Sequence, residues 1–134
     1  MEWKEYFNFT VVRHPLDRIV SEYYYSKDKW GFESIQDFIQ HPHLQGTLNA
    51  PIITINKKIA VDNILKFEDL EREWRLLLTA IGLDYVELPR ENSTQRPPNT
   101  PPEKVLGDRD IKTIAEKCPF EKTVHEKLGY EWRL

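Results

Sequence analysis

The alternation of apolar and polar segments along the chain predicts an α/β protein. Residues 9–12 form a short apolar run typical of a buried strand, and the segment after it is expected to be helical over residues 16–26. A second strand is predicted at residues 61–67, followed by a helix over residues 70–80 whose apolar positions recur on one face. Two strands that are each followed by a helix indicate a short parallel sheet flanked by helices.

Local signals predict the shorter elements. Ser34 is expected to cap a short helix over residues 35–39, and Asp69 can cap the helix that follows the second strand. Residues 27–31 are predicted to form an exposed turn. Residues 88–102 contain five of the nine prolines, so we expect them to be extended or turned.

Composition narrows the class of protein. The chain has 134 residues, 40% of them hydrophobic, which is enough for one compact core, so residues 1–134 are expected to form a single domain. A formal net charge of −3 argues against a nucleic-acid partner. The single cysteine, Cys118, is expected to be a small, partly buried thiol in a reducing compartment. The sequence shows neither a membrane segment nor a secretory signal, so we expect a soluble, cytoplasmic protein.

The most informative stretch is RHPLDRIVSEYYY, which begins at Arg13. Arg13 leaves the carboxyl end of the first predicted strand as a planar, always charged fork, and Ser21 adds a hydroxyl on the following helix. Both side chains can reach one anion near the amino terminus of that helix. The alternative is structural: Arg18 pairs with Asp17 or Glu22, Ser21 is a surface hydroxyl, and the tyrosines pack.

This stretch has the pattern R-x-P-x-x-R-x-x-S-x-Y, which resembles the 3′-phosphate-binding element of the sulfotransferases that use 3′-phosphoadenosine 5′-phosphosulfate (PAPS). The tyrosines at 23–25 look closest to carbohydrate sulfotransferases of the heparan sulfate 2-O type. Glu68-Asp69-Leu70 and the later Leu128-Gly129-Tyr130 resemble further segments of that family, in the same order. The resemblance implies a P-loop-like, three-layer sulfotransferase fold with a short parallel sheet.

The resemblance also implies which residues bind the cofactor. Arg13 and Ser21 would hold the 3′-phosphate of PAPS. In family members a loop at the position of residues 91–96 returns to the nucleotide, which makes Ser93 and Arg96 further cofactor ligands; the alternative is an ordinary solvated loop. The implied reaction transfers a sulfuryl group from PAPS to a hydroxyl acceptor, expected to be a carbohydrate, and needs no metal ion.

One part of the family pattern is missing from this sequence. No segment matches the loop that holds the 5′-phosphosulfate, and the five glycines are scattered, none in a loop followed by Lys-Ser or Lys-Thr. The chain therefore looks like the carboxyl-terminal portion of an incomplete sulfotransferase domain, which would lie in the Golgi lumen if it belongs to a longer anchored enzyme. We expect its uncovered sheet edge and apolar faces to cause self-association into a homo-oligomer, or marginal stability.

The sequence leaves open whether the chain is an enzyme. His14 is expected to be structural or adjacent to the cofactor, and His41, His43 and His125 are candidate bases by residue type alone, so catalysis is unassigned. Three functions remain in play. The chain is a sulfotransferase or a fragment of one, a non-catalytic module that keeps only the 3′-phosphate site and binds adenosine 3′,5′-bisphosphate or a partner chain, or another phosphate-binding α/β protein that shares the strand-Arg-helix geometry by chance.

Overall fold

The computed structural model describes residues 6–89 and 96–132. The chain divides into two compact units, residues 1–13 with 53–92 and residues 14–52 with 93–134. The described residues combine helices with a short parallel sheet, which confirms the predicted α/β class. The single domain over residues 1–134 stays a prediction. No helix in the two described ranges has the length and apolar character needed to cross a bilayer.

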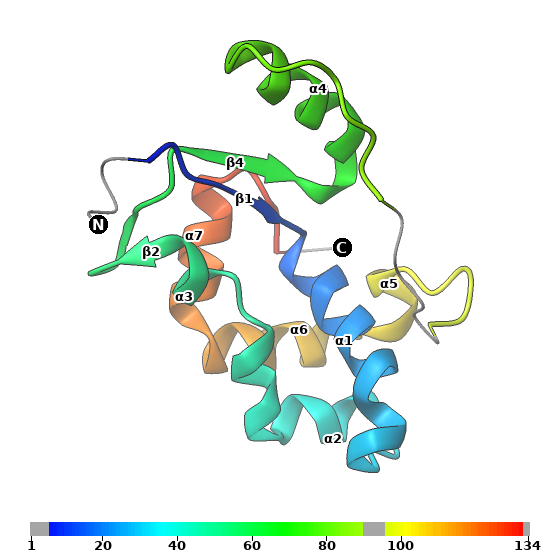
Figure 1. The fold of residues 1–134 in the computed structure, drawn as a ribbon. Coiled ribbons are helices and arrows are strands. Elements are labelled where there is room, and N and C mark those ends of the chain that lie inside the picture. The colour runs from blue at the N-terminus through cyan, green and yellow to red at the C-terminus, as the bar shows by residue number, and fades with distance from the viewer. Residues whose placement is uncertain (1–5, 90–95, 133–134) are drawn as a thin grey trace. The chain divides into compact units, whose positions relative to one another are not determined.

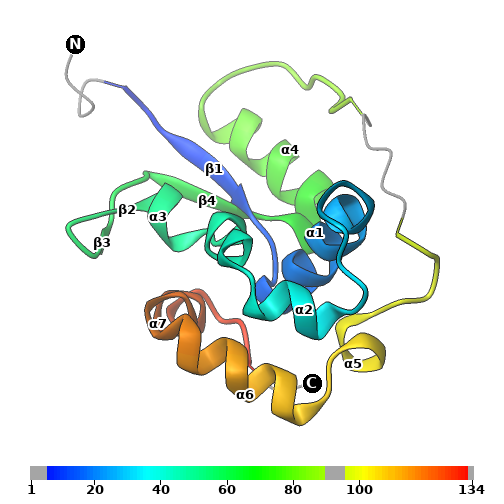
Figure 2. The same cartoon turned by 90° about the horizontal axis from the view of Figure 1, so that it is seen from below.

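The first unit contains the parallel sheet. Strand β1 (Phe9–Val12) runs parallel to β4 (Asn63–Lys66), with Val12 opposite Lys66. Figure 2 shows the two strands side by side. Both predicted strands are confirmed, and the second is shorter than expected because the 3-10 helix η3 (Phe67–Asp69) begins where β4 ends.

Helix α4 (Leu70–Ala80) follows η3 and contacts β4. Leu77 and Leu78 of this helix are buried, and the Trp74 ring lies 5.8 Å from the Phe9 ring of β1 between centroids. Asp69 stands at the N-cap position, but its carboxylate accepts a hydrogen bond from Arg72 Nε at 2.5 Å and does not cap a backbone N–H. At the start of α4 the Leu70 N–H instead donates a hydrogen bond to the Phe67 carbonyl of η3.

A small hairpin completes the first unit. Strands β2 (Thr54–Ile55) and β3 (Lys58–Ile59) pair antiparallel. The turn residues Asn56 and Lys57 have φ angles of 51° and 64°, as in a type I′ turn, whose twist matches that of the flanking strands. Strands of two residues are too short to show an alternating pattern, which is why the sequence did not reveal them.

The second unit is helical. Its longest helix, α1 (Pro15–Trp30), contacts both the α2 helix and the α5 helix, and α2 also contacts α6. Figure 1 shows α6 leading into α7 within this unit. Helix α3 (Ala50–Ile53) contains residues of both units. The remaining elements of the second unit are α2 (Ile35–Gln40), η2 (Pro42–Thr47), α5 (Pro102–Val105), α6 (Asp108–Lys117) and α7 (Pro119–Lys127).

The predicted exposed turn at residues 27–31 is wrong, because α1 continues through Trp30. Lysine favours the helical conformation, so the lysines of this segment do not end α1. The helix ends at Gly31, which adopts the left-handed conformation with a φ of 72° and donates its N–H to the Lys27 carbonyl. The predicted cap of α2 is confirmed: the Ser34 hydroxyl accepts a hydrogen bond from the Asp37 N–H at 3.2 Å.

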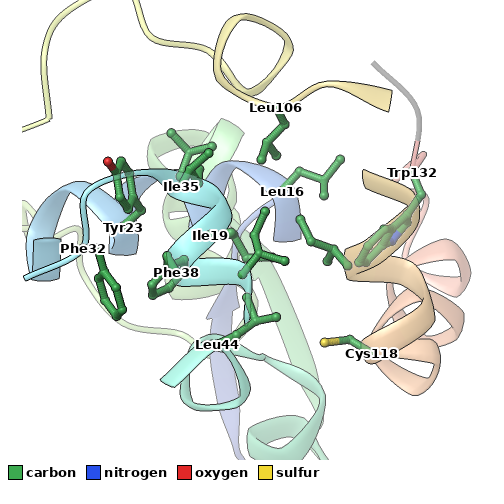
Figure 3. Packing of buried hydrophobic residues seen from close by; sticks show 13 residues of the cluster. Leu16, Ile19, Tyr23, Phe32, Ile35, Phe38, Leu44, Leu106, Cys118 and Trp132 are labelled. Atoms are coloured by element: carbon green, nitrogen blue, oxygen red, sulfur yellow. The ribbon is translucent and has the colours of Figure 1, made fainter. Parts of the chain in front are cut away.

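The core of the second unit joins α1 to the other helices. Figure 3 shows Leu16 and Ile19 of α1 among side chains from α2, α6 and the segment around Trp132. Complete burial of one such side chain is worth about 1.5 to 3 kcal/mol, so the first turns of α1 are firmly held. The cluster consists of Leu16, Ile19, Val20, Tyr23, Phe32, Ile35, Phe38, Ile39, Leu44, Leu106, Ile114, Cys118 and Trp132.

Candidate functional site

Arg13 lies directly after β1, as predicted from the sequence. Because β1 and β4 are parallel and Val12 pairs with Lys66, Arg13 and Phe67 both follow at the carboxyl edge of the sheet. The guanidinium carbon of Arg13 lies over the Phe67 ring, 4.4 Å from its centroid, at a distance suited to a cation–π interaction. The arginine is thus held at the edge where open α/β sheets place their ligands.

Ser21 lies on α1 within the first two turns, also as predicted. Its side chain is partly exposed, and its hydroxyl forms no hydrogen bond with the described part of the chain. Arg13 belongs to the first unit and Ser21 to the second, so their convergence on one anion stays a prediction.

The start of α1 is fixed by His14. Its Nδ1 accepts a hydrogen bond from the Leu16 N–H at 3.2 Å, so the ring proton sits on Nε2 and is donated to the Glu131 carbonyl at 2.8 Å. The ring also makes an edge contact with Tyr130, 5.3 Å between centroids. These contacts support the predicted structural role of His14, next to Pro15 at the first helical position.

Arg96 is engaged in the second unit by polar partners. Its guanidinium forms an ion pair with Asp17 Oδ1 of α1 at 2.9 Å and donates to the Thr100 hydroxyl at 3.1 Å and to the Thr100 carbonyl. Arg96 is therefore more than a solvated loop residue, although its role as a cofactor ligand stays a prediction. Ser93, the other predicted ligand in this segment, lies outside the described residues.

The remaining histidines each have defined partners. His41 Nδ1 accepts from the His43 N–H at 3.0 Å, and His43 Nε2 lies 3.0 Å from Glu22 Oε1. The Trp30 ring lies beside both imidazoles, with centroids 5.4 and 5.2 Å away. His125 is completely buried. None of these contacts singles out a base, so catalysis stays unassigned.

Sequence reasoning missed a buried polar cluster in the second unit. Glu121 of α7 is 2% exposed, and its carboxylate accepts backbone N–H bonds from Asn49 and Ala50, each at 2.8 Å. Asn49 also bonds His125 and Arg18 through its side chain. The signal available in the sequence was the spacing of Glu121 and His125, four residues apart and hence on one face of a helix.

The same carboxylate affects the one cysteine. Burial raises the pKa of the Cys118 thiol, and the negative charge of Glu121 raises it further, while a hydrogen bond from Gln45 acts in the opposite direction. Cys118 is 3% exposed, so the thiol is buried more completely than the sequence predicted. A raised pKa disfavours the reactive thiolate, so this residue is a poor nucleophile.

An open hollow of about 580 Å³ lies in the second unit, and none of the predicted ligands lines it. The hollow is lined by Lys122, Glu126, Gly129, Tyr130, Glu131 and Trp132.

Within residues 6–89 and 96–132, no three His, Cys, Asp or Glu side chains gather as a metal site would require.

Comparison with known proteins identifies a family whose sequence model covers most of the chain. The sequence model of the sulfotransferase family matches residues 2–114, which includes Arg13, Ser21 and the parallel strand pair. No curated protein matches the chain significantly. No solved structure does so either.

Proposed function

Because this chain belongs to the sulfotransferase family, we propose that it binds PAPS and takes part in transferring its sulfuryl group to a hydroxyl of a carbohydrate acceptor. The observation that carries the proposal is the position of Arg13, at the carboxyl end of a parallel strand and immediately before a capped helix that bears Ser21. The family match supports the sulfotransferase class, and the local geometry of the motif supports a phosphate-binding role.

The residues of the motif suit a phosphate dianion. A guanidinium can donate two parallel hydrogen bonds to phosphate oxygens, and a serine hydroxyl can donate a third. The Arg13 guanidinium lies over the π-face of the Phe67 ring, a cation–π contact that holds the charge at the carboxyl edge of the sheet. When bound, PAPS would supply the sulfuryl group: the bond between its sulfur and the 5′-phosphate oxygen would break as the acceptor oxygen bonds to sulfur, releasing adenosine 3′,5′-bisphosphate and the acceptor's proton to solvent. Arg13 and Ser21 bind and orient the nucleotide in this proposal; they do not break a bond.

A second function remains a candidate on two observations. His14, His41, His43 and His125 all have hydrogen-bond partners within the fold, and no sequence segment matches the loop for the 5′-phosphosulfate. A non-catalytic module that keeps the 3′-phosphate site would bind adenosine 3′,5′-bisphosphate and show no transfer. Sulfotransferase assays with PAPS and unsulfated polysaccharide acceptors distinguish it from the enzyme.

Calorimetric titration tests the cofactor proposal. Arg13→Ala should weaken adenosine 3′,5′-bisphosphate binding by about 2 to 4 kcal/mol because it removes a charge-assisted pair, and Arg13→Lys should recover part of the loss. Ser21→Ala should cost about 1 kcal/mol, since one neutral hydroxyl is lost. Adenosine 5′-phosphate, which lacks the 3′ group, should bind almost equally to all variants.

Arg75→Ala is the matched control. Arg75 also lies over an aromatic ring of the first unit, with its guanidinium carbon 3.9 Å from the Tyr85 centroid, but it is outside the predicted site. This variant should leave the affinity for both nucleotides unchanged. Equal losses for both nucleotides in Arg13→Ala would show that Arg13 supports the fold and does not read the 3′-phosphate.

A further inference from the structure

A series of hydrogen bonds crosses the second unit from α1 to α7. Arg18 Nη1 donates to Asn49 Oδ1 at 2.8 Å, and Asn49 Nδ2 lies 3.0 Å from His125 Nε2. On the other side of the ring, His125 Nδ1 lies 2.9 Å from the Glu121 carbonyl oxygen and 3.3 Å from Glu121 Oε1. Asn49, Glu121 and His125 are each no more than 2% exposed, so bulk water does not compete for these bonds.

The donors and acceptors in this series fit together in one direction. A guanidinium only donates, so Asn49 presents Oδ1 to Arg18 and therefore presents Nδ2–H to His125. His125 Nε2 must then accept, which leaves the ring proton on Nδ1, where it is donated to Glu121. Rotating the Asn49 amide by half a turn would place two donors against each other on the Arg18 side.

We infer that Arg18 is a positioning residue whose fixed charge, acting through the Asn49 amide, holds His125 as the neutral Nδ1–H tautomer. The histidine then donates toward Glu121, while the Glu121 carboxylate holds the backbone N–H groups of Asn49 and Ala50. The series fastens residues 49–50 and α7 to α1, the helix that carries Ser21. The second arginine of the R-x-P-x-x-R pattern thus supports the helix of the motif.

The inference rests on the proposed function only where it connects α1 with a 3′-phosphate. The series of hydrogen bonds itself involves only Arg18, Asn49, His125 and Glu121. The failure of this inference can therefore be told apart from the failure of the proposed function. If the hydrogen bonds form but Arg13→Ala weakens both nucleotides equally, the proposed function is wrong. If Arg13→Ala weakens only adenosine 3′,5′-bisphosphate but the hydrogen bonds do not form, this inference is wrong.

Nuclear magnetic resonance measures the tautomer directly. Long-range ¹H–¹⁵N correlation spectra of the ¹⁵N-labelled chain at neutral pH separate protonated from bare imidazole nitrogens. We expect His125 to carry its proton on Nδ1. His14 provides an internal control because its Nδ1 accepts from Leu16 and its Nε2 donates to Glu131, so it should show the opposite tautomer. His125 found with a proton on Nε2 in the unmodified chain overturns the inference.

Three variants test the role of Arg18. Arg18→Met removes the donors and lets the Asn49 amide turn, so His125 should become a mixture of tautomers, whereas Arg18→Lys keeps a cationic donor and should restore the Nδ1–H form. Asn49→Asp offers acceptors to both Arg18 and His125, so His125 should gain a proton on Nε2. His14 should not change in any variant. If the His125 spectrum stays unchanged in Arg18→Met, Arg18 does not set the tautomer and the inference is wrong. Should Arg18→Met not fold, an unchanged His125 spectrum in Asn49→Asp has the same meaning.

Discussion

Replacement of Glu121 by alanine should destabilise the chain far more than loss of an ordinary surface carboxylate. Glu121 is 2% exposed, and each of its carboxylate oxygens accepts a backbone N–H bond of 2.8 Å, one from Asn49 and one from Ala50. Removing the acceptor of a buried donor costs about 1 to 3 kcal/mol. Two such donors, together with the interaction with His125, give an expected loss of about 3 to 5 kcal/mol.

Urea unfolding followed by circular dichroism and tryptophan fluorescence measures this loss. The expected value is a large part of the 5 to 15 kcal/mol that is typical of a folded domain, so about 3 kcal/mol would shift the unfolding midpoint clearly. Glu121→Gln keeps one carbonyl oxygen but turns an amide donor toward the other N–H group. It should therefore lose about 2 kcal/mol, between the wild type and alanine.

Glu126→Ala is the matched control for Glu121→Ala. Glu126 lies on the same helix, is exposed, and pairs with Lys122 Nζ at 2.7 Å. An exposed pair of this kind contributes about 0 to 1 kcal/mol. If Glu121→Ala and Glu126→Ala reduce the free energy of unfolding by the same amount, the buried carboxylate is not what holds the backbone of residues 49–50, and the reasoning is wrong.

Three further predictions concern the backbone at Gly31 and the thiol of Cys118. Gly31→Ala should reduce the free energy of unfolding by about 1 kcal/mol, because a φ of 72° disfavours an L side chain even though nothing lies within 4 Å of the added carbon. Gly46→Ala is the control and should be neutral, because Gly46 has no such φ. Equal urea midpoints for the two variants would contradict this prediction. Cys118 should react with 5,5′-dithiobis(2-nitrobenzoic acid) slowly in the native chain and quickly in urea, and equal rates would refute its burial. The pKa of the Cys118 thiol is raised in the folded chain, so the protonated thiol should stabilise the fold fully below the ordinary thiol pKa of 9.0. This stabilisation should be lost as the pH rises from 9.0 through the raised pKa of the folded state, and Cys118→Ala should not show that loss.

The sequence predicted the elements whose signals are local. The strand at residues 9–12 and the helix after it depend on a short apolar run, a capping residue and a proline at the first helical position, all within a few residues. Ser34 and the helix after the second strand were predictable for the same reason. The end of α1 differs from the prediction because the charged residues at 27–29 continue the helix, and the residue that ends it is Gly31.

The buried polar cluster was not predictable in the same way. Asn49 and Glu121 are 72 positions apart in the sequence, and nothing near Asn49 shows that its N–H will meet a carboxylate. Charged residues are almost never completely buried unless they are paired, so a glutamate in an amphipathic helix is ordinarily expected on the exposed face. Burial of Glu121 becomes intelligible only when the partners brought by distant segments are known.

The two arginines of the R-x-P-x-x-R pattern illustrate the same limit. Both are always charged and both belong to one short motif, yet their surroundings differ: Arg13 lies over the Phe67 ring, and Arg18 donates to the buried side chain of Asn49. A hydrogen bond to an amide oxygen commits a donor and imposes an orientation on the acceptor. Residue type and spacing identify the motif, but they do not reveal which buried amide Arg18 meets, because Asn49 lies 31 positions further along the chain.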